Sequence, residues 1–289
     1  MSTTTTFIAP DGTELAYDVK GGPLDGRDRD PLICIPGGAM REPVYLGDLG
    51  GLAERRPLVI LNLRGTGRSA RPHDPRTYRA DRMIGDVEAL REHLGHERID
   101  LAAHSAGGTL ALLYAAAHPE QISSLTLITP SLRPLGLGPT DEHRNEARGL
   151  RRHEPWHADA VAAWQRIRQD EDAATNEDWL LFGHFFYGRW DDDVVAYETA
   201  SHSQFLNEEA SSIYASPDAL DPERTKAELA KLSAPVLILA AEYDSIPLPR
   251  IAAVAADCFQ NARLVVQERA GHFPWIDDPA AFLRLVIGG

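Results

Sequence analysis

The sequence is poor in cysteine and in long apolar runs, and each scarcity excludes a class of protein. Its 289 residues include two cysteines, Cys34 in the apolar run LICI and Cys258 in an alanine-rich segment. Such isolated cysteines favour buried small side chains over a disulfide framework or a metal site. No stretch approaches the ~18 uninterrupted apolar residues of a membrane-spanning helix. Residues 1–10 have neither a basic start nor an apolar run, so we expect no secretory signal, a cytoplasmic location and no membrane partner.

Positive charge is scarce as well. The chain has 29 basic and 43 acidic residues and a formal net charge of −14. Without a basic stripe to neutralise phosphates, we expect no nucleic-acid partner. Residues 131–230 hold 20 of the acidic and 10 of the basic residues, which is most of the net charge. This excess either forms a solvated helical surface or attracts cationic or amine-bearing substrates.

Apolar runs alternate with helical spacing over most of the chain and predict an α/β fold. Residues 7–19 alternate around Asp11-Gly12, which indicates a hairpin. Later apolar runs are short and continuous, and helical spacing, as in residues 81–94, separates them. Such a pattern is typical of a mostly parallel, doubly wound sheet covered on both faces. We expect its strands within residues 31–38, 57–65, 99–104, 122–129, 234–244 and 262–272, and a last helix at 274–287.

The alternation is interrupted once. Residues 131–230 contain four of the five tryptophans, many charges and helix-like stretches without strand-like runs. A helical insertion between two halves of one sheet explains this most economically. We therefore expect a core of residues 1–130 and 231–289 with an inserted helical cap at 131–230.

A candidate nucleophile lies in the sequence Ala103-His104-Ser105-Ala106-Gly107, which follows a predicted strand and opens a predicted helix. This is the context of a nucleophile turn, in which a cramped backbone exposes the serine oxygen above the sheet. The residues two before and two after the serine must be small, and here they are Ala103 and Gly107. Alanine stands where glycine is usual. The motif alone is also compatible with a tight strand–helix turn in which the serine has no catalytic role.

The base and the acid are expected later in the chain. A serine hydroxyl needs a base to take its proton, and in this fold the order is Ser, Asp, His. Asp244 and His272 each end a predicted strand, where parallel sheets gather their ligands. We predict Ser105 as nucleophile, His272 as base and Asp244 as the acid that orients it. Glu242 falls too early, within the strand end, and Asp277 is expected to face solvent from the next helix.

Two backbone amides are candidates for an oxyanion hole. Acyl transfer requires donors aimed at the developing negative charge. The amide of Ala106 follows the nucleophile, and that of Gly38 lies in the glycine turn after the first parallel strand. The alternative for Gly38 is a simple tight turn.

Other motifs point to neither a cofactor nor a metal. Residues 65–70 imitate a dinucleotide loop, but Pro72 follows where that motif must open a helix. His93 and His96 lack further ligands at metal spacing. Residues 191–193 lack the glycine and distal glutamate of a calcium loop. We expect no metal and no cofactor.

The sequence resembles the α/β-hydrolase superfamily along nearly its whole length, and its NLRGTGRS segment is similar to that of proline iminopeptidases and related serine hydrolases. The resemblance implies a helical cap, no cofactor, an acyl-enzyme on Ser105 and a small-molecule or short-peptide substrate. It is carried by residues 36–38 (PGG), 62–69 (NLRGTGRS), 103–108 (AHSAGG), 241–244 (AEYD) and 270–275 (AGHFPW).

The sequence departs from the iminopeptidase pattern where that family binds its substrate. Those enzymes hold the substrate's free amine with cap glutamates, one of which commonly precedes a His-aromatic-aromatic sequence. Residues 182–186 (FGHFF) have no such glutamate, Asn62 stands where an acid is more usual, and Pro36 replaces a frequent histidine. Glu208 and Glu209 are the alternative glutamates. The candidate aromatic contacts are Phe185 and Trp190.

Three functions follow as hypotheses. The first is hydrolysis of a small ester, thioester or amide, including an N-terminal prolyl peptide bond. The second is a natural-product tailoring hydrolase or acyl transferase, since an aromatic-rich cap suits a bulky apolar substrate. The third is a non-catalytic binding protein on a hydrolase scaffold. Dehalogenase and epoxide hydrolase chemistry is disfavoured, because those relatives need a carboxylate where Ser105 stands.

Overall fold

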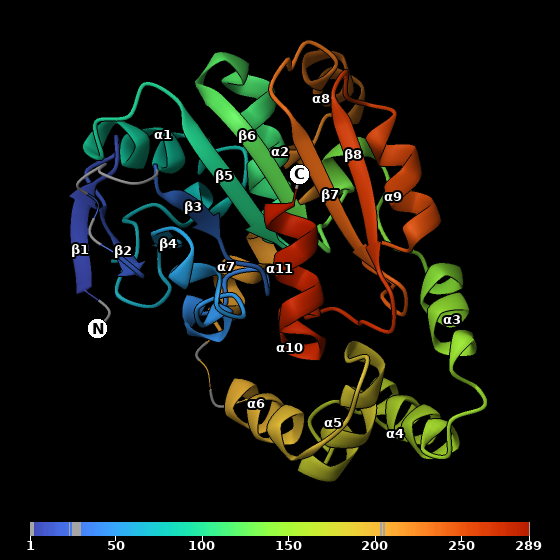
Figure 1. Cartoon of the computed structure of the whole chain (residues 1–289). Coiled ribbons are helices and arrows are strands. Elements are labelled where there is room, and N and C mark those ends of the chain that lie inside the picture. The colour runs from blue at the N-terminus through green and yellow to red at the C-terminus, as the bar shows by residue number, and fades with distance from the viewer. Residues whose placement is uncertain (1–2, 23, 25–29, 203, 205, 289) are drawn as a thin grey trace.

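An eight-stranded sheet forms the centre of the molecule (Figure 1). The computed structural model describes residues 3–22, 24, 30–202, 204 and 206–288. The strand order is β1-β2-β4-β3-β5-β6-β7-β8. β1 and β2 are antiparallel neighbours, as are β2 and β4, and all pairs from β3 to β8 are parallel. The predicted mostly parallel sheet is confirmed. Its strands are β1 (Thr3–Ile8), β2 (Glu14–Lys20), β3 (Leu32–Ile35), β4 (Leu58–Asn62), β5 (Ile99–His104), β6 (Ile122–Ile128), β7 (Val236–Ala241) and β8 (Ala262–Gln267).

Two apolar cores cover the two faces of the sheet. Alternate residues of one strand enter different cores, as Ile33 and Cys34 of β3 do, because successive side chains of a strand point to opposite faces. One core is completed by helices α1 (Ile84–His93), α2 (Gly107–Ala117), α8 (Pro222–Leu229) and α9 (Pro249–Ala256). The other is completed by α10 (Pro274–Asp277), α11 (Pro279–Ile287) and short 3₁₀ turns within residues 43–54. The central strands β3, β4 and β5 are therefore buried on both faces, which is why they read as continuous apolar runs. The edge strands β1 and β8 are partly exposed, with Ile8 and Val266 in contact with solvent.

Residues 274–287 form two helices instead of the single helix expected from the sequence. The backbone of Asp278 is extended between α10 and α11, and its carboxylate accepts the amide of Ala281 at 2.9 Å. Pro279 begins α11. Proline has no N–H and suits the first turn of a helix, where that donor would be unpaired. The apolar residues of 274–287 are helical as expected, but Asp278 and Pro279 divide them between two helices.

Within its described residues, the insertion between β6 and β7 consists of helices joined by turns, and its one β-type pairing is an isolated bridge at Leu206. Helices α4, α5 and α6 form a group beyond the carboxyl ends of the parallel strands (Figure 1). In contrast, α8 packs against α2 of the core. The part of 131–230 that stands away from the sheet is thus shorter than the whole insertion. The remaining helices are α3 (Asp141–Leu150), α4 (His157–Gln169), α5 (Asn176–Gly183), α6 (Asp192–His202) and α7 (Glu208–Tyr214).

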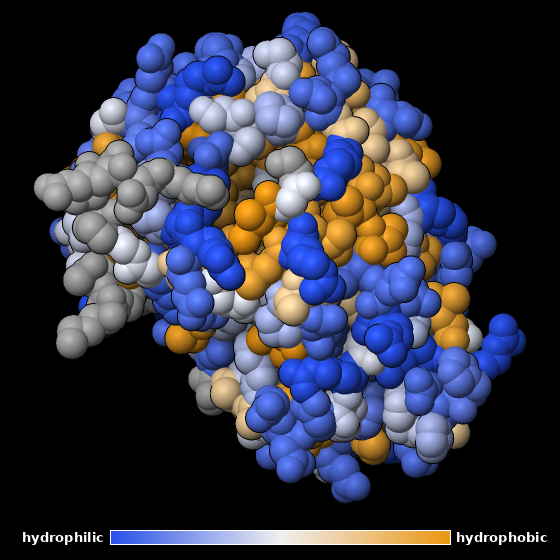
Figure 2. Space-filling view, in the orientation of Figure 1, coloured by the Kyte–Doolittle hydropathy of each residue, from blue (hydrophilic) through white to orange (hydrophobic). Residues whose placement is uncertain are grey.

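Figure 2 shows an apolar patch on the face where α11 lies across the last strands, surrounded by hydrophilic residues. Val266 of β8 and Ile287 of α11 are 38% and 39% exposed. On this side α11 covers the sheet only in part, which leaves apolar side chains in contact with solvent. Within the described part of the chain, no helix has the length and apolar character to cross a membrane.

Candidate active site

Ser105 lies in a tight turn between β5 and α2. Its φ is +51°, a left-handed conformation that a residue with a side chain adopts only when its surroundings impose it. The crowding is visible at two neighbouring glycines. A Cβ on Gly107 would lie 2.5 Å from the carbonyl oxygen of Pro36, and one on Gly37 would lie 2.6 Å from the Cβ of Ser105. The turn therefore tolerates no larger residue at these two positions.

Ser105, His272 and Asp244 form one hydrogen-bonded chain. Ser105 Oγ lies 2.8 Å from His272 Nε2, and His272 Nδ1 lies 2.7 Å from Asp244 Oδ2. The three residues are 9%, 7% and 3% exposed. The other oxygen of Asp244, Oδ1, accepts the amide of Ile246 at 2.9 Å, which fixes the carboxylate. The structure thus brings together three groups that are far apart in the sequence, in the arrangement that general base catalysis requires.

The two amides predicted for the oxyanion hole border the same turn. Gly38 lines a cavity together with Ser105, and Ala106 precedes the first residue of α2. Neither amide donates to another described residue. The first N–H groups of a helix lack intrahelical acceptors, and the helix dipole favours negative charge there. Both amides are available to an anionic oxygen at Ser105.

A buried chain of hydrogen bonds ties the glycine turn to the histidine loop. The hydroxyl of Tyr45 accepts the amide of Gly37 at 2.5 Å and lies 2.8 Å from His104 Nδ1. His104 Nε2 lies 3.0 Å from the carbonyl oxygen of His272. Because the His272 carbonyl can only accept, the proton of the neutral His104 ring lies on Nε2. Nδ1 therefore accepts the hydroxyl proton of Tyr45, an assignment inferred from the hydrogen bonds. Burial, together with the nearby His272 ring, holds the pKa of His104 well below its usual value, so this ring stays neutral.

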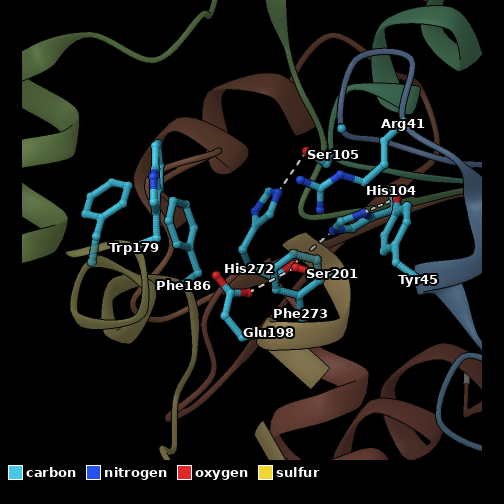
Figure 3. Close-up of a pocket in the computed structure, with 12 residues that line it drawn as sticks. Arg41, Tyr45, His104, Ser105, Trp179, Phe186, Glu198, Ser201, His272 and Phe273 are labelled. Carbon is cyan, nitrogen blue, oxygen red and sulfur yellow. Dashed lines mark hydrogen bonds between the residues drawn. The ribbon is translucent and has the colours of Figure 1, made fainter. Parts of the chain in front are cut away.

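An aromatic cavity of about 270 Å³ opens in front of the serine. Figure 3 shows Trp179 and Phe186 on one side of His272, and Arg41 and Tyr45 on the other. The cavity thus combines apolar walls with one guanidinium and one carboxylate. It is lined by Gly38, Arg41, Tyr45, His104, Ser105, Trp179, Phe182, Phe186, Glu198, Ser201, His272 and Phe273.

The residues proposed from the sequence to bind substrate lie elsewhere. Glu208 and Glu209 are exposed in the first turn of α7, and neither lines the aromatic cavity. Trp190 is half-buried and stacks on His184 with ring centroids 4.0 Å apart. Phe185 lines a separate, smaller cavity beside Asp244. The glutamate that does line the cavity is Glu198 of α6, whose carboxylate accepts the hydroxyl of Tyr187 at 2.6 Å.

Residues 186–188 of the insertion touch the loop that carries His272 through their backbones. The amide of His272 donates to the carbonyl oxygen of Phe186 at 2.7 Å. A Cβ on Gly271 would lie 2.3 Å from that same oxygen, and one on Gly188 would lie 1.7 Å from the carbonyl oxygen of Arg269. Only glycine permits so close an approach. These backbone contacts hold Phe186 beside the imidazole of His272, and no local sequence pattern predicts them.

Asp277 does not face solvent, contrary to the expectation from the sequence. It is 9% exposed, and its Oδ2 accepts the amide of Gly271 at 2.7 Å. Burial raises the pKa of this carboxyl to about 6. The short helix α10 turns Asp277 inward, so that it supports the loop that carries His272. Glu242 is placed at the surface end of β7, where its carboxylate accepts the amide of Arg269 at 2.6 Å.

Ser105 also lines a second, more polar cavity of about 370 Å³. Ala106, Arg133 and Arg144 lie on its wall, whereas His272 does not. The serine is therefore accessible from two sides, and a compound bound at Ser105 has room for a substituent on each. Within the described residues, no group of three or more His, Cys, Asp or Glu side chains is arranged to hold a metal ion.

Comparison with known proteins identifies a family to which this chain is similar. A family model described as alpha/beta hydrolase fold matches residues 30–279. The proline iminopeptidase of Heyndrickxia coagulans is 24% identical and covers 95% of this chain and 97% of its own. The solved proline iminopeptidase of Mycobacterium smegmatis has a TM-score of 0.71 at 19% identity, covering 98% of this chain and 97% of that one. A thermophilic esterase from Thermogutta terrifontis has a TM-score of 0.69 at 19% identity, covering 99% and 97%. Peptidases and esterases are thus both similar to this chain.

Proposed function

We propose, from the premise that this chain belongs to the alpha/beta hydrolase fold family and is a hydrolase, that it cleaves small esters or amides through an acyl-enzyme on Ser105. The observation that carries the proposal is the continuous chain from Ser105 Oγ through His272 to Asp244, with both bonds shorter than 3 Å. Ser105 and His272 line a cavity large enough for a small substrate.

The proposed reaction has two halves. Ser105 Oγ attacks the carbonyl carbon, and its proton passes to His272 Nε2. The oxyanion is held by the amides of Gly38 and Ala106. When the tetrahedral intermediate collapses, the bond to the leaving group breaks and that group takes the proton from Nε2. A water molecule then loses a proton to His272, attacks the acyl carbon and releases the acid, and Ser105 regains its proton. Asp244 keeps the imidazole oriented and stabilises its charged form.

Residues 131–230 act in this proposal as the cap. Their α5, together with the 3₁₀ turn at His184–Phe186, contributes Trp179, Phe182 and Phe186 to the cavity wall. Apolar walls exclude water and strengthen the electrostatic interactions inside the site. The mixture of aromatic wall and few polar groups supports a small substrate that is apolar in part.

The N-terminal peptidase activity named for the Heyndrickxia relative is the second candidate. It is favoured by Glu198, a carboxylate in the cavity wall that is able to meet an amine. However, Glu198 already accepts the hydroxyl of Tyr187, so we place esters and uncharged amides first. Prolyl-naphthylamide and short-chain nitrophenyl esters, assayed side by side, separate the two.

The test of the mechanism is Ser105→Ala. We expect turnover of an activated ester to fall ~10⁴-fold or more with the fold retained. A fluorophosphonate probe should label the unaltered enzyme and the control variant Ser123→Ala, and leave Ser105→Ala unlabelled. Near-normal activity of Ser105→Ala, or equal labelling of all three proteins, would refute the proposal.

A further inference from the structure

Arg41 stands in the aromatic cavity beside the proposed oxyanion loop. It lines that cavity with Ser105 and His272, and Figure 3 shows its guanidinium directed toward them. A Cβ on Gly38 would lie 2.7 Å from Arg41 Cβ and 3.4 Å from Arg41 Nε. The side chain therefore passes directly over the glycine whose amide is proposed to hold the oxyanion.

The guanidinium of Arg41 has no partner among the described residues. No hydrogen bond or ion pair connects its side chain to another residue of the described part of the chain, and its Nε is buried and unbonded. Arg64, which is also buried, shows the usual alternative, since it is paired with Asp86 and Asp11. A buried donor without a partner costs about 1–3 kcal/mol, and more when it is charged. An anionic group in the cavity would supply the acceptors that this guanidinium lacks among the described residues.

The fold holds Arg41 in this position. The backbone of Arg41 forms an antiparallel bridge with Leu206, and the amide of Asn207 donates to the carbonyl oxygen of Met40 at 3.1 Å. Ala39 and Met40 have φ values of +35° and +75°. Such conformations persist where the surrounding structure imposes them, and they cluster at functional sites. The backbone from which the Arg41 side chain extends is thus fixed by the fold.

We propose that Arg41 binds a carboxylate of the substrate, so that the preferred substrates are esters or amides whose acyl part ends in a carboxylate. This inference rests on the function proposed above. A guanidinium presents a planar fork of donors that matches a carboxylate with two parallel hydrogen bonds. Because Arg41 adjoins Gly38, that carboxylate lies a short chain away from the scissile carbonyl. Among the described residues that line the aromatic cavity, Arg41 is the one basic residue of the lysine or arginine type.

The carboxylate of Glu198 and the acidic residues of the cap also affect whether Arg41 can bind a carboxylate. Glu198 lies in the same cavity, but its carboxylate accepts the Tyr187 hydroxyl, and no ion pair joins it to Arg41 in the described structure. The acidic residues of the cap lower the potential around the site, but solvent screens exposed charges beyond a Debye length of ~8–10 Å. A guanidinium in direct contact with its ligand is screened far less.

The experiment compares two esters of nearly equal shape, monoethyl succinate and ethyl pentanoate, by ethanol release. Arg41→Gln removes the charge, Arg41→Lys keeps it without the planar fork, and Arg71→Gln removes an exposed charge as control. A hydrogen bond to a charged group contributes about 1.5–3 kcal/mol, or about 10- to 150-fold. We expect kcat/KM for monoethyl succinate to fall by that factor in Arg41→Gln and by less in Arg41→Lys. The values for ethyl pentanoate, and all values for Arg71→Gln, should change little.

An equal loss on both esters in Arg41→Gln would overturn the inference, because Arg41 would then act on the oxyanion or the fold. A preference of the unaltered enzyme for ethyl pentanoate would overturn it too. Fluorophosphonate labelling of Ser105 in these variants separates the two proposals. If Ser105 is not labelled, the proposed hydrolase function fails, and if it is labelled, only the carboxylate inference is at issue. Calorimetric binding of monoethyl succinate to Ser105→Ala and to Ser105→Ala/Arg41→Gln tests the carboxylate site without turnover. Equal affinity of these two proteins would also refute it.

Discussion

Tyr45→Phe removes a single oxygen from the buried chain that joins the glycine turn to the histidine loop. Tyr45 is 3% exposed and His104 is 2% exposed. The ring of phenylalanine fits the same space, so no cavity or clash is introduced. The loss is confined to the bonds of that oxygen with the Gly37 amide and with His104 Nδ1.

The size of the effect follows from the two groups left without partners. An unsatisfied buried donor or acceptor costs about 1–3 kcal/mol, and part of this is recovered because phenylalanine is easier to bury than tyrosine. We expect the free energy of unfolding to fall by about 2–4 kcal/mol. Activity should fall through kcat more than through KM, because the Gly37–Gly38 turn and the His272 carbonyl lose their common support.

Urea unfolding, followed by fluorescence and by circular dichroism, measures the change. Tyr114→Phe is the matched control. Its hydroxyl donates to Glu88 at 2.8 Å, but that carboxylate also binds Arg91 and keeps a partner when the hydroxyl is gone. The control should lose less than about 1.5 kcal/mol. If Tyr45→Phe is no less stable than Tyr114→Phe and keeps its kcat, the argument for this chain is wrong.

Two further predictions concern buried charge. Burial raises the pKa of Asp277 to about 6, against an ordinary 3.8, so the folded state binds the carboxyl proton more tightly than the unfolded state does. The contribution of this carboxyl to the free energy of unfolding therefore falls as the pH rises from about 4 to 7. Asp277→Asn keeps an acceptor for Gly271 without titrating, and its stability relative to the unaltered protein should rise by about 2–3 kcal/mol over that range; a constant difference in thermal unfolding at the two pH values would contradict this. Arg64→Leu leaves Asp86 buried and unpaired and should cost about 3–5 kcal/mol, with part regained in Arg64→Leu/Asp86→Leu. Equal stability of both variants and the unaltered protein would exclude a role for this pair.

The sheet and the convergence of the three proposed catalytic groups were predictable because both depend on local pattern. Buried strands are continuous apolar runs, and Asp11-Gly12 marks the hairpin between β1 and β2. Parallel strands bring their carboxyl ends to one edge, so residues after β5, β7 and β8 must approach each other. In the structure, Ser105, His272 and Asp244 lie within hydrogen-bond distance of one another in that order.

The lining of the cavity was not predictable in this way. Glu198, Arg41 and Tyr45 come from segments with no motif, and they meet only because α5, α6 and the 36–46 loop pack around Ser105. Glu208 and Glu209 looked equally suitable in the sequence, yet the first turn of α7 directs them to solvent. The residues around a glutamate in the sequence do not tell whether it will face the cavity or solvent. That depends on how the helices of the insertion pack against the core.

The sequence by itself determined the order of strands and helices, the strained serine turn and the edge of the sheet where chemistry is expected. Each of these depends on periodicity, small residues and chain direction, which are properties of short segments. The tertiary structure alone decided which charges enter the cavity, that Asp277 is buried and that Tyr45 supports the site through His104. These depend on packing and hydrogen bonds between residues distant in the chain, which the pattern of a short segment does not specify.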